Sequence, residues 1–173
     1  MSAGPSLVGL DENEWERLKN LRLVALEQDP GAFGSTLERE LALPEARWRQ
    51  RLSGARSRTL VATRDGADVG LVMGWPWEGE SAVSGLFGLW VAPSARGAGV
   101  GGELTKGIVD WARRCSFERM RLHVWEANES ALALYVAHGF VDTGRTWSPP
   151  PPREHLVKRE LELELDPDGQ TSS

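Results

Sequence analysis

The segment GLFGLWVAPSARGAGVGG, residues 85–102, decides the fold of this chain. Residues 85–91 are mostly apolar and include Phe and Trp, which is typical of a buried strand. After Pro93 a glycine-rich stretch runs directly into a helical pattern. Glycines there let the main chain turn and approach a ligand, and the free N–H groups at a helix start attract anions. Arg96 adds donors suited to phosphate, so the segment predicts a pyrophosphate site.

The composition fits one domain, which we expect to span residues 1–165 and to be followed by a disordered tail at 166–173. The chain has 173 residues, of which 40% are hydrophobic. Its net charge of −5 argues against a nucleic-acid binder. Cys115 is the single cysteine and cannot form an internal disulfide. Because no apolar run suggests a signal peptide or membrane span, we expect a cytoplasmic protein without membrane partners.

Capping residues, turn residues and hydrophobic periodicity predict alternating strands and helices. In the first half we expect a strand at 6–10, helices after Asp11 and Ser35 and from Pro44, strands at 58–64 and 69–75 around an Asp65-Gly66 turn, and a loop at 76–81. In the second half we expect a helix after the glycines, a strand at 122–125, a helix from Asn128 or Ser130 to Gly139, and strands at 140–146 and 155–165. This order indicates an α/β (α+β) class with a mixed sheet.

Two other phosphate-binding motifs compare poorly with the glycine segment. A P-loop requires Gly-Lys-Ser/Thr, whereas Gly101-Gly102 is followed by Glu103. The dinucleotide pattern G-x-G-x-x-G is present, and Glu126 lies near the expected position of a ribose-binding acid. However, residues 93–96 separate the strand from the glycines, and about half of the chain precedes the motif. We therefore set the dinucleotide interpretation aside.

The arrangement resembles the GNAT superfamily of N-acetyltransferases, which bind acetyl-coenzyme A. Residues 96–101, RGAGVG, match the first family signature Gln/Arg-x-x-Gly-x-Gly/Ala. The second signature, an Asn followed by a helix ending in Leu-Tyr-x-x-x-Gly-Phe, matches Asn128 and residues 134–140. The resemblance is strong over residues 85–141. It implies a mixed, mostly antiparallel central sheet with a splayed strand pair, flanked by helices.

The resemblance also implies a role for each matched residue. Pantetheine would bind the exposed backbone of the splayed strand, the N–H groups of the glycine segment would bind pyrophosphate, and Asn128 would contact the cofactor arm. Tyr135 would hold the thioester sulfur and protonate the departing thiolate as general acid. The implied cofactor-binding residues are Leu89, Trp90, Val91, Arg96, Gly97, Ala98, Gly99, Val100, Gly101, Gly102, Asn128 and Tyr135.

The implied reaction is direct attack of a neutral primary amine on the thioester through a tetrahedral intermediate. Backbone donors of the splayed strand would stabilise the oxyanion. A base must deprotonate the acceptor, and Glu126 is the leading candidate. The other candidate bases are Glu78, Glu80, His123, Glu38 and Glu40. One departure from the family is Ala137, where a basic residue is common, which leaves phosphate contacts to Arg96, Lys106, Arg113 or Arg114.

Several of these residues also have purely structural interpretations. Tyr135 on an apolar helix face could be a core tyrosine with a satisfied hydroxyl, and Asn128 could simply cap its helix. We interpret His123 and His138 as structural and expect no metal site. Cys115 closes a helix stripe and is most simply a packing residue. Trp75, Trp77, Trp125 and Trp147 either pack or line an aromatic acceptor pocket.

A second functional hypothesis is a non-catalytic acyl-coenzyme A binding or sensing domain. Such a domain would keep the glycine loop but has no need of an acid at Tyr135. The sequence does not identify the amine acceptor, and small amines, polyamines, amino-acid derivatives, antibiotics and protein N-termini all remain open. The tryptophan count and the habit of the family are compatible with a homodimer.

Overall fold

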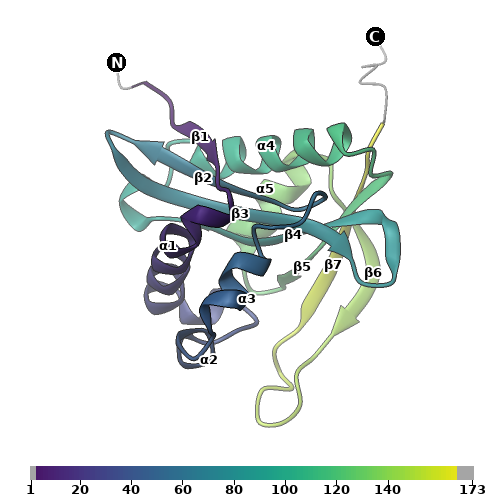
Figure 1. Cartoon of the computed structure of the whole chain (residues 1–173). Helices are drawn as coiled ribbons and strands as arrows, with labels where there is room; N and C mark the ends of the chain where they lie inside the picture. Colours follow the sequence, from purple (N-terminus) through teal and green to yellow (C-terminus); the bar gives the residue numbers. More distant parts are fainter. Residues whose placement is uncertain (1–2, 167–173) are drawn as a thin grey trace.

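The computed structural model describes residues 3–166 as a seven-stranded sheet with helices on both faces (Figure 1). Apart from Asp166, the predicted disordered tail lies outside the described residues. The strands are β1 (Ser6–Gly9), β2 (Arg58–Arg64), β3 (Ala67–Trp77), β4 (Glu80–Val91), β5 (Arg119–Trp125), β6 (Val141–Trp147) and β7 (Lys158–Glu164). The helices are α1 (Trp15–Gln28), α2 (Leu37–Leu41), α3 (Glu45–Gln50), α4 (Val100–Arg114) and α5 (Glu129–Ala137).

The strand order is β1-β2-β3-β4-β5-β7-β6. Only the β4–β5 pair is parallel, and the other neighbours are antiparallel. The expected mixed, mostly antiparallel sheet flanked by helices is therefore confirmed. Among residues 3–166 no helix combines the length and apolarity needed to cross a bilayer.

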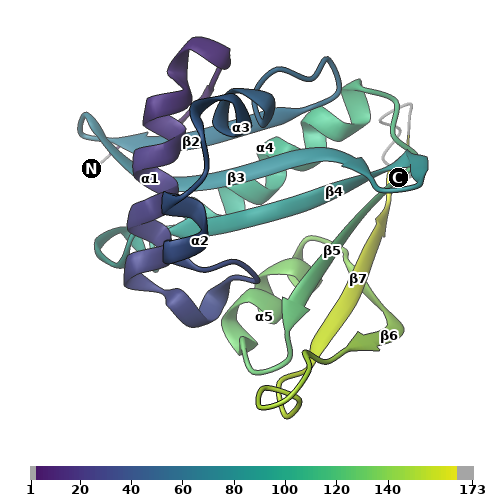
Figure 2. The ribbon, with the colours of Figure 1, turned by 60° about the horizontal axis from the view of Figure 1, so that its bottom comes forward.

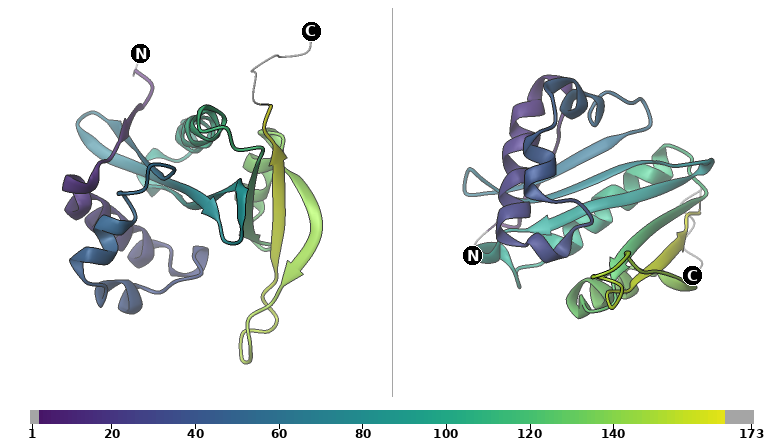
Figure 3. Two further views of the ribbon diagram at one scale, coloured as in Figure 1. Left: turned by 45° about the vertical axis from the view of Figure 1, so that its right-hand side comes forward. Right: turned by 90° about the horizontal axis from the view of Figure 1, so that it is seen from below.

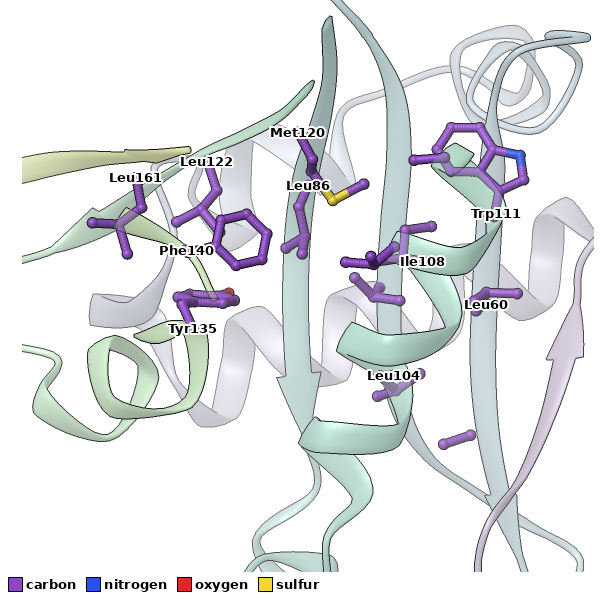
Figure 4. Close-up of a cluster of buried hydrophobic side chains, with 14 of the residues drawn as sticks. Leu60, Leu86, Leu104, Ile108, Trp111, Met120, Leu122, Tyr135, Phe140 and Leu161 are labelled. Atoms are coloured by element: carbon purple, nitrogen blue, oxygen red, sulfur yellow. The ribbon is translucent and has the colours of Figure 1, made fainter. Parts of the chain in front are cut away.

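Each face of the sheet carries its own hydrophobic core. Helices α1–α3 cover one face and α4 lies on the opposite side (Figure 3). Residues such as Leu18, Trp48 and Leu71 form the core under α1–α3, which we call the N-terminal lobe. The second core joins Leu104 and Ile108 of α4 to the sheet and to α5 (Figure 4). Both cores reach β4, so this strand is shared by the two layers.

The parallel strands β4 and β5 are paired at one end only. Their register joins Val83–Gly85 to Arg119–Arg121, and beyond Gly85 the two strands diverge (Figure 2). A β-bulge accompanies the divergence, because Gly88 and Leu89 together stand opposite Val72 of β3. Gly88 has a positive φ of 62°, which glycine adopts without strain. Since bulges bend a strand and increase its twist, this feature accounts for the splayed strand pair that the family resemblance implies.

Two local predictions are wrong. The helix α2 is capped by Thr36, whose hydroxyl accepts the Arg39 N–H at 3.2 Å, and not by Ser35. The predicted loop at 76–81 is largely strand, because β3 continues to Trp77 and β4 starts at Glu80. Pro76 stays in the strand beside a register irregularity, where a missing N–H is tolerated.

The paired end of β4 and β5 is held by a buried arginine. Arg121, whose side chain is 5% exposed, contacts Glu80 at 2.6 Å and Glu162 at 2.7 Å. These contacts link β4, β5 and β7 at the point from which the splay opens. The hydrogen bond from Arg121 also contributes most to holding the pKa of the Glu80 carboxyl below its usual value.

We expect Arg121→Met to lower the free energy of unfolding by about 2–4 kcal/mol, because it removes the buried and most closely placed counterion of these carboxylates. Arg119→Met is the matched control, since Arg119 contacts the same Glu80 and Glu162 but is 33% exposed. The free energy of unfolding of Arg119→Met should fall by less than about 1 kcal/mol. Urea unfolding followed by fluorescence measures both, and equal losses would contradict the role given to Arg121.

Candidate active site

A cavity of about 800 Å³ lies between the N-terminal lobe and the sheet and reaches α5 through the splay. Phe87 and Leu89 of β4 line it on one side, and His123 and Trp125 of β5 line it on the other. Asn128 and Tyr135 contribute to the lining from α5. Because the N-terminal lobe and α5 lie on opposite sides of the sheet, the opening between β4 and β5 connects these two sides.

The glycine segment leads from the end of β4 into the first turn of α4. Gly97 and Gly99 have positive φ angles of 77° and 81°, and Gly99 is the N-cap of α4. No side chain caps this helix, so its first N–H groups keep their donor capacity. A Cβ placed at Gly97 or Gly99 would meet no atom within 4 Å. Free donors, the helix dipole and open space together suit a pyrophosphate.

Arg96 holds this loop to the lobe. Its Nη2 lies 2.7 Å from Asp29 Oδ2 and its Nε donates to the Val91 carbonyl at 2.9 Å. The Trp90 indole donates to the same Asp29 oxygen at 2.8 Å. The Arg96 guanidinium is thus engaged within the protein, and the main-chain N–H groups are the available phosphate donors. Sequence reasoning missed Asp29, because an Asp before Pro-Gly indicated only a helix end.

Tyr135 places its ring in the core and its hydroxyl group beside the cavity. The residue is 6% exposed, and its ring packs against Phe140 at 5.7 Å (Figure 4). Within residues 3–166 the hydroxyl forms no hydrogen bond, although the residue lines the cavity. Burial raises the pKa of the phenol above its ordinary value. The structural interpretation therefore holds for the ring, but the satisfied hydroxyl that it requires is missing.

The other predicted cofactor contacts differ in how they face the cavity. Asn128 caps α5 by accepting the Ala131 N–H at 3.2 Å and also lines the cavity, so both interpretations of this residue are compatible. Leu89 lines the cavity, whereas the Trp90 side chain is buried in the lobe. Val91 lies beside Gly101 of α4. Beyond Gly85, the edge of β4 that faces β5 has no strand partner, and its backbone groups are available to a ligand.

Of the six candidate bases, Glu40 and His123 line the cavity. Glu40 is 2% exposed and contacts Arg22 at 3.0 Å and Arg51 at 3.1 Å. Burial raises the pKa of this carboxyl, but the hydrogen bonds and charges of the two arginines outweigh burial and hold it below its usual value. His123 Nε2 lies 3.4 Å from Glu160 Oε2.

The leading candidate, Glu126, does not line the cavity. Its carboxylate is about half exposed and forms an ion pair of 2.8 Å with Arg159. Glu126 follows the last residue of β5, where we expected it to reach the site. The sequence placed the residue at the correct strand end, but it could not show that Arg159 of the neighbouring β7 would engage the carboxylate.

Aromatic rings form one wall of the cavity. Trp75 stacks on Phe87 with ring centroids 4.1 Å apart, and the Trp77 ring centroid lies 5.9 Å from that of Phe87. Gly85 leaves room for this arrangement, since a Cβ there would lie 2.1 Å from Phe87. Trp125 also lines the cavity, whereas Trp147 is 53% exposed and contacts the Lys158 ammonium. Sequence reasoning missed Phe87 and Lys158, whose strand patterns gave no signal beyond packing.

The remaining candidates occupy structural positions. His138 Nδ1 lies 2.9 Å from the Leu134 carbonyl, and Cys115 is half-buried against the core at the end of α4. Lys106 and Arg113 pair with Asp110. In the described part of the chain, no group of three or more His, Cys, Asp or Glu side chains has the arrangement of a metal site.

Comparison with known protein families identifies the family to which this fold belongs. The sequence model of the acetyltransferase (GNAT) family matches residues 15–140, most of the chain. The chain belongs to this family. The matched range includes the glycine segment, Asn128 and Tyr135, so the resemblance found in the sequence is confirmed. GNAT acetyltransferases use acetyl-CoA as their cosubstrate.

Individual relatives agree with this family assignment. The mycothiol acetyltransferase of Stackebrandtia nassauensis is 36% identical over 86 residues, which cover 47% of this chain and 28% of that protein. The chain thus spans less than a third of this curated relative. A GNAT acetyltransferase from Streptococcus pneumoniae has a TM-score of 0.76 at 20% identity, with 93% of this chain and 100% of that chain covered.

A GNAT-type structure from Kribbella flavida has the same TM-score at 23% identity, with 94% of this chain and 98% of that chain covered. A Salmonella typhimurium protein solved with its cofactor acetyl-CoA has a TM-score of 0.71 at 18% identity and covers 99% of each chain. At these identities the likenesses show a shared GNAT fold. The predicted GNAT architecture, including the sheet and its flanking helices, is confirmed.

Proposed function

We propose that this protein transfers the acetyl group of acetyl-CoA to a primary amine by direct attack, with Tyr135 as the general acid. The observation that carries the proposal is the unpartnered Tyr135 hydroxyl at a cavity that passes between β4 and β5. Within the cavity, this phenol and the unpaired edge of β4 face the same opening. The pyrophosphate would bind the N–H groups at the start of α4, and the pantetheine would bind the exposed backbone of residues 86–91.

The chemistry assigns one job to each group. The amine nitrogen attacks the thioester carbonyl carbon, a C–N bond forms, and the C–S bond breaks. Tyr135 gives its proton to the sulfur, so that the thiol leaves instead of a thiolate, and the proton that the attacking nitrogen releases restores the phenol. The phenol suits this step because burial keeps it protonated. Main-chain N–H groups near the bulge of β4 are the natural donors to the developing oxyanion.

His123 replaces Glu126 as the proposed base. It lines the cavity, and its Nε2 lies 3.4 Å from Glu160 Oε2. A carboxylate next to an imidazole orients the ring. Glu40 also lines the cavity, but its arginine partners hold it as a carboxylate with a lowered pKa, which makes it a weak base. In this proposal His123 accepts the proton that the acceptor ammonium must lose before attack.

Release of free thiol tests the proposed function. The protein is incubated with acetyl-CoA and a panel of primary amines, and thiol formation is compared with the mass of the acetylated amine. We expect equal amounts of thiol and acetylated amine for at least one acceptor. Binding of acetyl-CoA without thiol release across the panel would instead favour the binding or sensing domain.

The raised pKa of Tyr135 predicts an unusual alkaline limb in the pH profile. A general acid works only while protonated, so a raised pKa moves the loss of activity to higher pH. We expect kcat to stay constant up to about pH 10, where an ordinary tyrosine would be half ionised. Tyr135 is the single tyrosine in the chain, so the ultraviolet absorbance of tyrosinate reports its ionisation directly. An alkaline midpoint clearly below that pH, in protein that is still folded by circular dichroism, would contradict the assignment.

A further inference from the structure

The acceptor side of the cavity carries an excess of positive charge. Five basic side chains line the cavity, and a single carboxylate, that of Glu40, stands against them. The five basic residues are Arg22, Arg39, Arg47, Arg51 and Lys158. The chain as a whole has a net charge of −5, so this excess is a local feature of the cavity. A cavity of this sign favours an anionic ligand and disfavours a polycation.

The carboxylate of Glu40 does not neutralise the excess positive charge of the cavity, because two arginines already share this carboxylate. Arg22 and Arg51 both contact its carboxylate, which leaves the cluster with one surplus positive charge. Arg22 is buried, and its Nη1 has no hydrogen-bond partner in the described part of the chain. The lobe side of the cavity therefore presents a net positive charge.

Lys158 is a half-buried cation within this region of excess positive charge. Its ammonium lies 4.5 Å from the Trp125 ring centroid and 5.5 Å from that of Trp147. A Cβ on Gly34 of the lobe would lie 2.8 Å from its Nζ, so the side chain bridges β7 and the lobe. Among residues 3–166 no carboxylate lies within ion-pair distance of it. Burial, followed by the charge of Arg153, lowers the pKa of this ammonium, as expected for a cation without an anionic partner.

The opposite wall of the cavity is apolar and aromatic. Trp75 and Phe87 stack there, and Trp77 extends the stack toward His123. An acceptor that fits both walls has an aromatic or large apolar body and a separate anionic group. The coenzyme does not meet this description on this side of the sheet, because the pyrophosphate site lies at the start of α4, outside the residues that line the cavity.

We infer that the acceptor is a small primary amine that carries both an aromatic ring and a carboxylate, and that Lys158 binds this carboxylate. The inference rests on the proposed function and adds the chemical class of the acceptor. In this arrangement the aromatic wall holds the body of the acceptor and Lys158 fixes its acidic group. Those two contacts orient the amine toward the opening between β4 and β5.

The experiment compares molecules that differ only in the carboxylate. Phenylalanine and tryptophan are titrated by calorimetry into the protein saturated with coenzyme A, beside their amides and decarboxylated amines. We expect the two carboxylate compounds to bind at least about tenfold more tightly than their neutral or cationic analogues. Equal or tighter binding of the analogues, or no binding of any compound, would overturn the inference. Because this readout needs no turnover, it separates the inference from the proposed function, which the thiol assay tests.

Variants of Lys158 test whether its ammonium binds the carboxylate of the acceptor. Lys158→Gln should remove the preference for the carboxylate, raising the Kd and KM of the carboxylate compounds about tenfold to a hundredfold with little change in kcat. Lys158→Arg should restore most of the preference, because it keeps the charge. Lys19→Gln is the control, since Lys19 lies on α1 and does not line the cavity.

Two results would overturn the role of Lys158. A loss of kcat in Lys158→Arg with unchanged KM would make the residue a base and not a carboxylate ligand. A parallel loss of acetyl-CoA affinity in Lys158→Gln would assign the ammonium to the coenzyme.

Discussion

Tyr135→Phe should lower kcat by about tenfold to a thousandfold while leaving acetyl-CoA affinity nearly unchanged, as expected for the loss of a general acid. The substitution removes one hydroxyl and keeps the ring that packs against Phe140. Steady-state kinetics and calorimetric titration with acetyl-CoA measure the two quantities on the same protein. An unchanged kcat would remove Tyr135 from the mechanism.

Stability provides the control for this variant. Because the hydroxyl forms no hydrogen bond within residues 3–166, its removal leaves no buried partner unsatisfied. The free energy of unfolding should therefore change by less than about 0.5 kcal/mol. A loss of activity together with a large loss of stability would indicate a structural defect and not a missing acid.

Gly99→Ala should weaken acetyl-CoA binding by about tenfold to a hundredfold, the second large effect that we expect. Gly99 has a φ of 81°, and a Cβ costs about 1–2 kcal/mol in this region, so the loop would relax toward another conformation. Relaxation redirects the N–H groups at the start of α4, and the methyl group enters the open space beside them. Calorimetric titration with acetyl-CoA and with coenzyme A measures the change.

Gly66→Ala is a closely matched control for Gly99→Ala. Gly66 has a φ of 79°, and a Cβ there also meets no atom within 4 Å, but the residue lies in the turn between β2 and β3. Both variants should lose similar stability, and only Gly99→Ala should lose coenzyme affinity. Equal coenzyme affinities in the two variants would place the pyrophosphate elsewhere.

The sequence predicted those parts of the fold that depend on local chemistry. The Asp11 capping box, the Asp65-Gly66 turn and the left-handed Gly139 depend on a few neighbouring residues, and all three occur as expected. The glycine-rich turn into α4 was equally predictable, since it combines strand, glycines and helix within one short segment. The splayed strand pair followed from the family resemblance, and the structure supplies its physical origin in the bulge at Gly88.

The acceptor side of the site could not be predicted in the same way. Lys158, Phe87 and Arg22 come from three distant parts of the chain, and only the folded sheet brings them to one cavity. The same reason explains why Glu126, the first candidate for the base, does not line the cavity. Whether Glu126 faces the cavity or an arginine depends on β7, which pairs with β5 across more than thirty residues of sequence.

The bulge in β4 also determines to which face of the sheet each side chain at the end of that strand points. Before it, Leu86 faces α4 and Phe87 faces the lobe. After it the alternation is inverted, so that Leu89 and Val91 face α4 and Trp90 faces the lobe, where its indole reaches Asp29. Without the additional residue, Trp90 would point into the opposite core and the anchor on Asp29 would be lost. The additional residue at Gly88 therefore sets the phase of the strand along which we propose that both substrates bind.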